Sequence, residues 1–206
     1  MLRYVFLIAV WLLASLSCAQ AQGPQCRTSP VGTSTPNCAS ESFVTKSVPP
    51  PGQLPGTSTN DSAGAGNVGQ VINSCVPLGS AVSLTNASPA NVTSIAVTAG
   101  DWDIEGDVSY SIAATTSVSA FSASISDVSA TLPTAPNVTT NFPDGGGLNF
   151  VRMPATVFGA SSANAYPTGA VRALLSGNTT IYLIAFSNFT VATNKAFGCI
   201  TARRRR

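Results

Sequence analysis

The sequence contains no histidine, and only 9% of its 206 residues are charged. Without histidine, a nucleophilic triad lacks its usual general base, and the commonest metal-binding side chain is also missing. Typical globular domains carry about 25% charged residues, so Ser, Thr, Asn and Gly must cover much of this protein's surface. The composition therefore argues against a hydrolase of the triad class and against a histidine-based metal centre.

Neither sign of charge is in large excess, because the formal net charge is only +2. The positive side chains are concentrated in the run of arginines at residues 203–206. Such a run can contact phosphates or a membrane surface, but it lacks the interleaved aromatic residues and broad basic face of a nucleic-acid site. We interpret it as the solvated end of a last strand and expect no nucleic-acid partner.

A long apolar run occurs only near the start of the chain, at residues 5–16, with Arg3 before it and the A-x-A sequence of residues 19–21 after it. These features predict a secretory signal peptide over residues 1–21. The run is about twelve residues, whereas a membrane span needs about 20, so we expect no transmembrane span. The protein is therefore predicted to be secreted, periplasmic or displayed on a bacterial cell surface.

An alternative processing route starts from Cys18, because residues 15–18 resemble the lipoprotein box of bacteria. In that route Cys18 would carry a lipid. The cleavage site just beyond it favours a signal peptide that is removed after residue 21. The two routes lead to a free or to a lipid-anchored protein at the cell surface.

Four cysteines remain after cleavage, namely Cys26, Cys38, Cys75 and Cys199. An even number of cysteines in an exported chain indicates disulfides, and three pairings are open. We expect Cys26–Cys38 as a local loop and Cys75–Cys199 as a bond between the first and last strand regions of the main domain. No C-x₂-C pair is present to begin a zinc site.

The composition divides the mature chain into three parts. Residues 22–46 form a small cysteine-containing segment, and residues 47–67 are rich in Pro, Gly, Ser and Thr. A segment of the second kind cannot bury a core and is typical of a disordered stalk or linker. Residues 68–206 have the alternating apolar and polar pattern of β-strands and are expected to form the main domain.

The main domain shows many short strand patterns and no sustained helical periodicity. The expected strands are 70–73, 81–85, 92–98, 101–113, 117–129, 150–153, 169–175, 179–191 and 196–203. Strands at this spacing, separated by turn residues, predict an all-β fold, an antiparallel two-sheet sandwich of jelly-roll-like type. Residues 132–148 and 154–167 are expected to be loops, where binding usually resides.

Residues 91–112 show most clearly which face of a strand must turn inward. Its apolar residues share one face of a strand: Trp102, Ile104, Val108, Tyr110 and Ile112. Its acidic residues share the other: Asp101, Asp103, Glu105 and Asp107. A shift of one residue would bury the four carboxylates, so the apolar face must turn inward.

The acidic face has three interpretations. Neighbouring carboxylates would stand about 6.6–7 Å apart, which lies within the about 5–9.5 Å that glycosidases use. Clustered carboxylates also supply the oxygen ligands of calcium. On a flat exposed strand, however, such side chains do not converge on one substrate atom. We therefore expect a solvated face and no enzymatic activity, with a calcium site and a carboxylate-based glycosidase as the alternatives.

Aromatic side chains in loops are the candidates for stacking on a sugar. The expected loops and their borders contain Phe142, Phe150, Phe158 and Tyr166. Trp102 and Tyr110, in contrast, lie on the inward face and are expected to belong to the core. The hypothesis is therefore that loop aromatics provide a binding surface for a glycan.

Several ordered motifs resemble a known group of proteins. They are NVTSIAVTAGDWD (91–103), SATLP (129–133), IYL (181–183) and ARR (202–204). Over residues 78–206 the chain resembles the C-terminal domains of bacteriophage and prophage tail-fibre or structural proteins. A second element, GTSTPNCASESFV (32–44), is similar to a short Ser/Thr-rich element that recurs in tail fibres. The resemblance implies a virion-type fibre module whose β-sandwich assembles as a homotrimer.

Together these observations predict an exported, non-enzymatic protein of the tail-fibre type with no cofactor, whose head recognises a cell-surface glycan or acts as a structural knob. The alternative is a bacterial cell-surface or lipid-anchored structural protein with the same fold and no role in host recognition.

Overall fold

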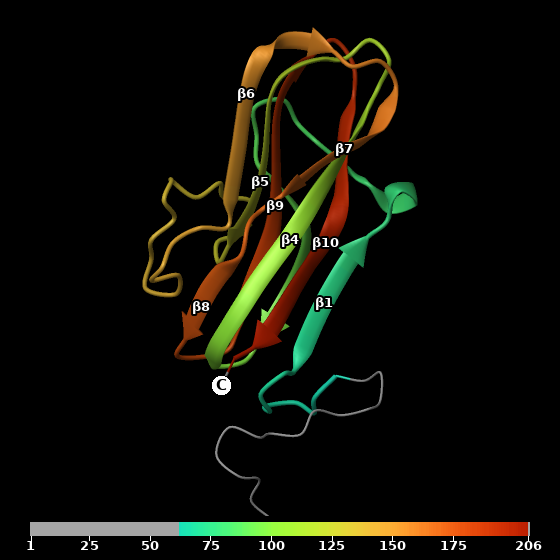
Figure 1. Ribbon diagram of the computed structural model, residues 1–206. Helices are drawn as coiled ribbons and strands as arrows, with labels where there is room; N and C mark the ends of the chain where they lie inside the picture. The colour runs from blue at the N-terminus through green and yellow to red at the C-terminus, as the bar shows by residue number, and fades with distance from the viewer. Residues whose placement is uncertain (1–61, 206) are drawn as a thin grey trace, which may run out of the picture. The chain divides into compact units, whose positions relative to one another are not determined.

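The computed structural model describes residues 62–205, which form ten β-strands and one short 3-10 turn (Figure 1). The elements are β1 (Val71–Val76), η1 (Leu78–Ser80), β2 (Val82–Ser83), β3 (Ala90–Val97), β4 (Gly100–Ile112), β5 (Ser117–Ser126), β6 (Leu148–Val157), β7 (Ser161–Pro167), β8 (Val171–Leu175), β9 (Thr179–Thr190) and β10 (Asn194–Arg204). The predicted cysteine segment, the predicted linker up to residue 61 and the Cys26–Cys38 pair lie outside the described residues.

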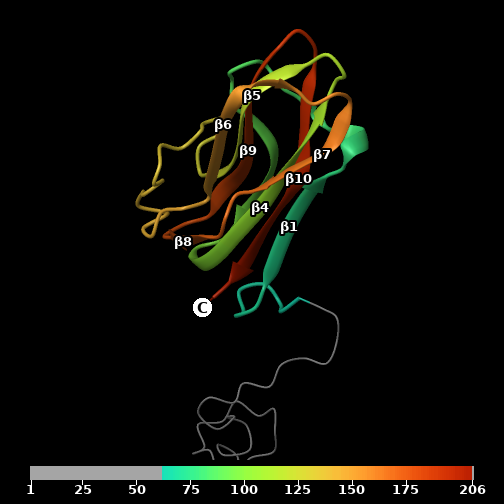
Figure 2. The same ribbon diagram turned by 45° about the horizontal axis from the view of Figure 1, so that its top comes forward.

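The strands form two packed antiparallel sheets, which confirms the predicted all-β sandwich (Figures 1 and 2). Sheet A has the order β1-β10-β4-β7, with β8 also paired to β4 and β2 to β10. Sheet B has the order β3-β9-β5-β6. Because β4 and β10 are the longest neighbours in sheet A and β9 and β5 are central in sheet B, these four strands form most of the core.

Strand β4 has the predicted alternation. Each of its five inward side chains is at most 3% exposed: Trp102, Ile104, Val108, Tyr110 and Ile112. They pack against inward residues of sheet B such as Phe121 and Leu183. Burying a large apolar side chain stabilises a fold by about 1.5–3 kcal/mol, so this one strand provides much of the driving force for closing the sandwich.

The prediction of a loop at residues 154–167 is wrong. Strand β6 continues to Val157, and β7 pairs with β4 (Tyr166 opposite Val108). Strand β7 has the sequence SSANAYP, which lacks the apolar alternation of a half-buried strand. Pro154 also reads as a strand breaker, but β6 is the last strand of sheet B, where an edge tolerates proline. The expected loop at 132–148 is confirmed except at Leu148, where β6 begins, and it contains a single isolated bridge between Gly146 and Val171.

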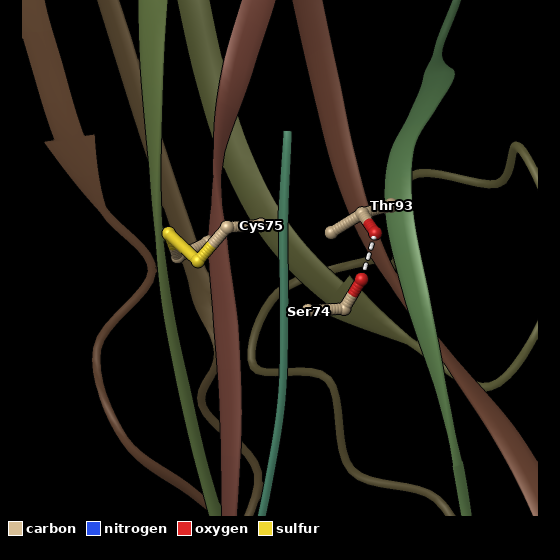
Figure 3. The surroundings of a disulfide bond; sticks show 4 residues. Ser74, Cys75 and Thr93 are labelled. Atoms are coloured by element: carbon tan, nitrogen blue, oxygen red, sulfur yellow. Dashed lines mark hydrogen bonds between the residues drawn. A yellow bond between two sulfur atoms is a disulfide. The ribbon is translucent and has the colours of Figure 1, made fainter. Parts of the chain in front are cut away.

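The predicted Cys75–Cys199 disulfide is present and joins directly opposite residues of β1 and β10 (Figure 3). Ser74, the preceding residue, points to the other side of β1 and shares a 2.6 Å hydrogen bond with Thr93 of β3 (Figure 3). Strand β1, which is the edge of sheet A, is therefore fixed on one face by a covalent bond and on the other by a contact between the sheets.

The predicted solvent exposure of the arginine run is wrong for Arg204. This side chain is 8% exposed, and its guanidinium lies 4.5 Å from the centre of the Trp102 ring. It donates hydrogen bonds to the carbonyl of Ala99 at 3.2 Å and to the hydroxyl of Thr98. Gly100 leaves the space for it, because a Cβ there would overlap the guanidinium. The prediction holds for Arg203, which is exposed.

Candidate functional site on the outer face of sheet B

The four acidic residues of β4 do not act as a unit. The expected solvated face is wrong for Asp101, which is only 5% exposed because its carboxylate accepts two 3.0 Å hydrogen bonds from Arg172. These bonds raise the pKa of the Arg172 guanidinium. Asp103 pairs with Arg205 at 3.3 Å, while Glu105 and Asp107 are exposed. Within residues 62–205, no three acidic or cysteine side chains are grouped closely enough to hold a metal ion. The described residues thus give the calcium alternative no cluster of acidic ligands.

Three of the four predicted aromatic candidates pack in or against the core. Phe142 is fully buried. Phe158 and Tyr166 pack on Phe121, with ring centres 5.8 Å and 5.0 Å away. Phe158 and Tyr166 are partly exposed, whereas Phe150 is 37% exposed and lies in β6 rather than in a loop. The expected set of four loop aromatics is therefore not brought together.

The register of sheet B places Phe150 in a group that the sequence did not reveal. Ser122 of β5 is opposite Phe150 of β6 on one side and Phe186 of β9 on the other. One row further along, Ala120 lies between Arg152 and Asn188. These residues alternate with core residues, so they project from the outer face of the sheet. We call this group the aromatic platform; it consists of Phe150, Phe186, Arg152, Asn188 and Ser122.

The two phenylalanines of the aromatic platform lie close together above β5. Their ring centres are 5.7 Å apart, and the rings are tilted by 33°. The guanidinium of Arg152 lies 5.2 Å from the centre of the Phe150 ring, so it is held beside the pair by a cation–π contact. Asn188, which lies across Ala120 from Arg152, is exposed. An apolar surface with polar groups at its rim is the arrangement that fixes and orients a small ligand.

The floor beneath the rings is polar. The hydroxyls of Ser122 and Ser124 are buried and have no hydrogen-bond partner among the described residues. Leaving a buried hydroxyl unpaired costs about 1–3 kcal/mol, and native proteins contain few such groups. Ser124 lies one row further along, between Leu148 and the fully buried Ile184. Only the hydroxyl of Ser122 lies directly under the aromatic pair.

The core supports the aromatic platform from behind. The hydroxyl of Tyr110, on β4, donates to the main-chain carbonyl of Ser122 at 2.5 Å and also lies 3.0 Å from that of Phe186. Ser122 lies between the two phenylalanines in the register of the sheet, and Phe186 is one of the two. Tyr110 therefore crosses between the sheets and fixes the backbone of β5 and β9 at the platform. Burial raises the pKa of Tyr110 well above its usual value.

The Tyr110 contact predicts a specific loss of stability at alkaline pH. A raised folded-state pKa favours the neutral phenol, so this stabilisation is complete below the unfolded pKa of about 10 and is lost as the pH rises above it. We expect Tyr110→Phe to lower the free energy of unfolding by about 1–3 kcal/mol at pH 7. Denaturant titrations between pH 7 and 11 should show a weaker decline for the variant. Parallel curves for the two proteins would contradict this role.

Sheet B is also distinguished by its charge. Arg152 is the one charged residue in its four strands, all of which are described, whereas β4 alone carries four acidic residues. The ion pairs between described residues are Arg172 with Asp101 and Asp144, and Arg205 with Asp103, so none involves Arg152. The guanidinium of Arg152 therefore offers an unneutralised charge on a face that is otherwise nearly uncharged.

Of the aromatic platform, sequence reasoning named only Phe150 and missed Phe186, Asn188, Arg152 and Ser122. In the β9 sequence TTIYLIAFSNFT, a period of two places Tyr182, Ile184, Phe186 and Asn188 on one face. That signal identifies the outward residues of β9. It does not identify which residues of β5 and β6 lie beside them, because that depends on the register between strands.

No protein-family model matches the chain, and no curated protein is significantly similar to it. No helix within residues 62–205 is long and apolar enough to span a membrane. The class of protein is therefore defined by the fold and the site alone, as an antiparallel β-sandwich with an aromatic face on sheet B.

Proposed function

We propose that this protein is an exported, non-enzymatic module of the phage-tail-fibre type whose aromatic platform binds a cell-surface glycan. One observation carries the proposal: an aromatic pair lies at the surface, beside an unpaired arginine, on a sheet face with no other charge in its strands. The apolar face of a sugar ring can pack on Phe150 and Phe186. Its hydroxyls can bond to Arg152 and Asn188, which surround the rings.

The scaffold suits this role. Phe186 belongs to β9, which is hydrogen-bonded on both sides, and Phe150 belongs to β6 beside β5 (Figure 1). Side chains on paired strands keep their relative positions better than side chains on loops, so less order has to be imposed on binding.

Export and assembly complete the proposal. The signal-peptide pattern at residues 1–21 and the Cys75–Cys199 disulfide both fit an oxidising compartment outside the cytoplasm. The resemblance to fibre modules implies a homotrimer. In this proposal the three copies meet through surfaces that leave the aromatic platform accessible.

The glycan proposal predicts that Phe186→Ala weakens binding at least tenfold. The loss follows because half of the stacking surface disappears, while the partly exposed ring contributes little to the core. A glycan array should first identify the best binding glycan for the wild-type protein, and biolayer interferometry should then give the affinities of both proteins.

Phe197→Ala is the matched control for that experiment. Phe197 is also partly exposed and lies on β10, opposite Ser109 of β4, so it projects from the outer face of the other sheet. We expect this variant to bind like the wild type. Equal losses in both variants, or no binding to any glycan on the array, would contradict the proposal.

The second candidate function is structural and uses the same face. In this case the protein is a cell-surface or lipid-anchored component, and sheet B packs against another copy of the chain. The observation in its favour is the near absence of charge from the strands of sheet B. Light scattering separates the candidates, because Phe150→Glu would dissociate the assembly only if this face lies between copies.

A further inference from the structure

The charge on the aromatic platform is isolated. Arg152 is exposed and has no acidic partner among the described residues. Asp127, just beyond the other end of β5, accepts a 2.8 Å hydrogen bond from Asn141. It stands seven residues from Ala120, the neighbour of Arg152, which corresponds to roughly 23 Å along a strand. No carboxylate of sheet B therefore competes for this guanidinium.

The placement of Arg152 holds it beside the aromatic pair. Its Cζ atom lies over the Phe150 ring, 5.2 Å from the ring centre, and its N–H groups are available to a ligand. A guanidinium presents these donors as a fork that fits two oxygens of a carboxylate, sulfate or phosphate. A neutral hydroxyl uses only one of the donors. The geometry thus favours a ligand with a planar or tetrahedral anionic group beside the aromatic pair.

The unpaired hydroxyl of Ser122 is a second and independent sign of a ligand. It is fully buried beneath Phe150 and Phe186 and lacks a partner among the described residues. Both rings belong to side chains with exposed or partly exposed surface, so they can separate without disturbing the core. A sugar hydroxyl that enters between them would supply the missing hydrogen bond.

We infer that the aromatic platform selects acidic saccharides. A carboxylate, sulfate or phosphate of the sugar pairs with Arg152, the sugar ring stacks on Phe150 and Phe186, and a neighbouring hydroxyl reaches Ser122. This inference rests on the proposed glycan-binding function and adds the chemical class of the ligand. It distinguishes the platform from a surface that binds neutral sugars by stacking alone.

The test uses the full mature protein and matched pairs of probes. The acidic probes are fragments of hyaluronate, alginate, polygalacturonate and polysialate, together with heparin fragments and a phosphorylated mannan. The neutral probes are the same carboxylated fragments after reduction of the carboxyl groups to alcohols, and desulfated or dephosphorylated forms of the others. We expect at least one acidic member to bind at least tenfold more tightly than its neutral counterpart, and the pair that responds identifies the anionic group.

Arg152→Gln separates this inference from the proposed function. We expect the variant to bind the acidic and neutral members of the responding pair within a factor of two of each other, because stacking remains and the charge is gone. The inference is wrong if the wild type binds the neutral members as tightly as the acidic members, or if the Arg152→Gln variant still prefers the acidic members. The proposed glycan-binding function is unaffected by either result. If the wild type binds no probe and no glycan on the array, both fail.

Ser122→Ala tests the hydroxyl separately from the charge. We expect its unfolding midpoint to rise, because an unpaired buried hydroxyl is removed, while its affinity for the acidic fragment falls about fivefold. Ser124→Ala is the control, since it removes the other unpaired hydroxyl beside the fully buried Ile184. That variant should gain stability with unchanged affinity. Unchanged affinity for Ser122→Ala as well would remove the hydroxyl contact from the inference.

Discussion

Gly198→Ala is expected to lower the free energy of unfolding by about 3 kcal/mol or more, enough to abolish most of the folded population of a marginal domain. Gly198 lies in β10 opposite Val108 and has a φ of +153°, which side chains rarely adopt. A Cβ at this position would overlap the carbonyl oxygen of Asp107. Because the obstacle is the backbone of the neighbouring strand, no rotamer change relieves it, and β4 and β10 must separate.

Urea unfolding followed by far-ultraviolet circular dichroism measures this effect. Gly177→Ala is the matched control, since Gly177 lies in the turn between β8 and β9 and a Cβ there meets no atom within 4 Å. We expect the control to change stability by less than about 0.5 kcal/mol, as surface substitutions do. A Gly198→Ala protein with the stability of the control would show that β4 and β10 are not packed as described.

Loss of the Cys75–Cys199 disulfide is the other change with a large expected effect. The bond joins residues 124 positions apart and so encloses β2 to β9 within one covalent loop. Closing a loop of this size restricts the unfolded chain and stabilises the fold by about 3–5 kcal/mol in the chain-entropy account. We therefore expect the double variant Cys75→Ser, Cys199→Ser to unfold at much lower denaturant concentration than the oxidised protein.

The disulfide experiment has an internal check. The wild-type protein treated with a dithiol reductant should move toward the midpoint of the double variant, because Cys75 is exposed and open to attack by thiolates. Ser74→Ala, one residue away, removes only the 2.6 Å hydrogen bond to Thr93 and should cost about 1 kcal/mol. A double variant that loses no more than Ser74→Ala would contradict the stapling role of the disulfide.

Some features of the fold followed directly from local sequence. The alternation of β4 was predictable because turning its acidic face into the apolar core would be prohibitive, which leaves one choice of inward face. The burial of Asp101 beside Arg172 was not predictable from that pattern. The Cys75–Cys199 bond was predictable because the two residues lie in the first and last strand regions of the domain. For β4 a single physical constraint, the cost of burying charge, selected the inward face, whereas the disulfide was the expected one of three open pairings.

Other features depended on contacts between distant segments. The sequence of β7 has no apolar alternation, and it becomes a strand because the edge of β4 offers it hydrogen-bonding partners. Arg204 was expected in solvent because its neighbours are also arginines. Its burial depends on Trp102 and on the space at Gly100, which lie about a hundred residues earlier. No local pattern contains that information.

Two of the motifs that carry the fibre resemblance meet at one corner of sheet A. Thr98 and Ala99, in the first motif, accept hydrogen bonds from Arg204, which ends the last motif. Trp102 provides the ring beneath the guanidinium. The pairing gives these residues a structural role in the fold.

The candidate site was the least predictable part of the molecule. Phe150 was identified as a binding residue, but its partners Phe186 and Ser122 were not, because they become neighbours only through the register of β6, β5 and β9. Phe142, Phe158 and Tyr166 were expected at the surface because they were assigned to loops. Phe142 is instead fully buried, and Phe158 and Tyr166 pack partly buried against the core.

The most direct test of the glycan-binding claim is a titration of the ¹⁵N-labelled protein with the best glycan from the array, followed by ¹H–¹⁵N chemical shifts. The aromatic platform predicts the largest shifts at the amides of residues 120–122, 150–152 and 186–188, in adjacent rows of sheet B. Largest shifts on β4 and β10, or in the loop of residues 131–147, would place the binding site elsewhere and contradict the account.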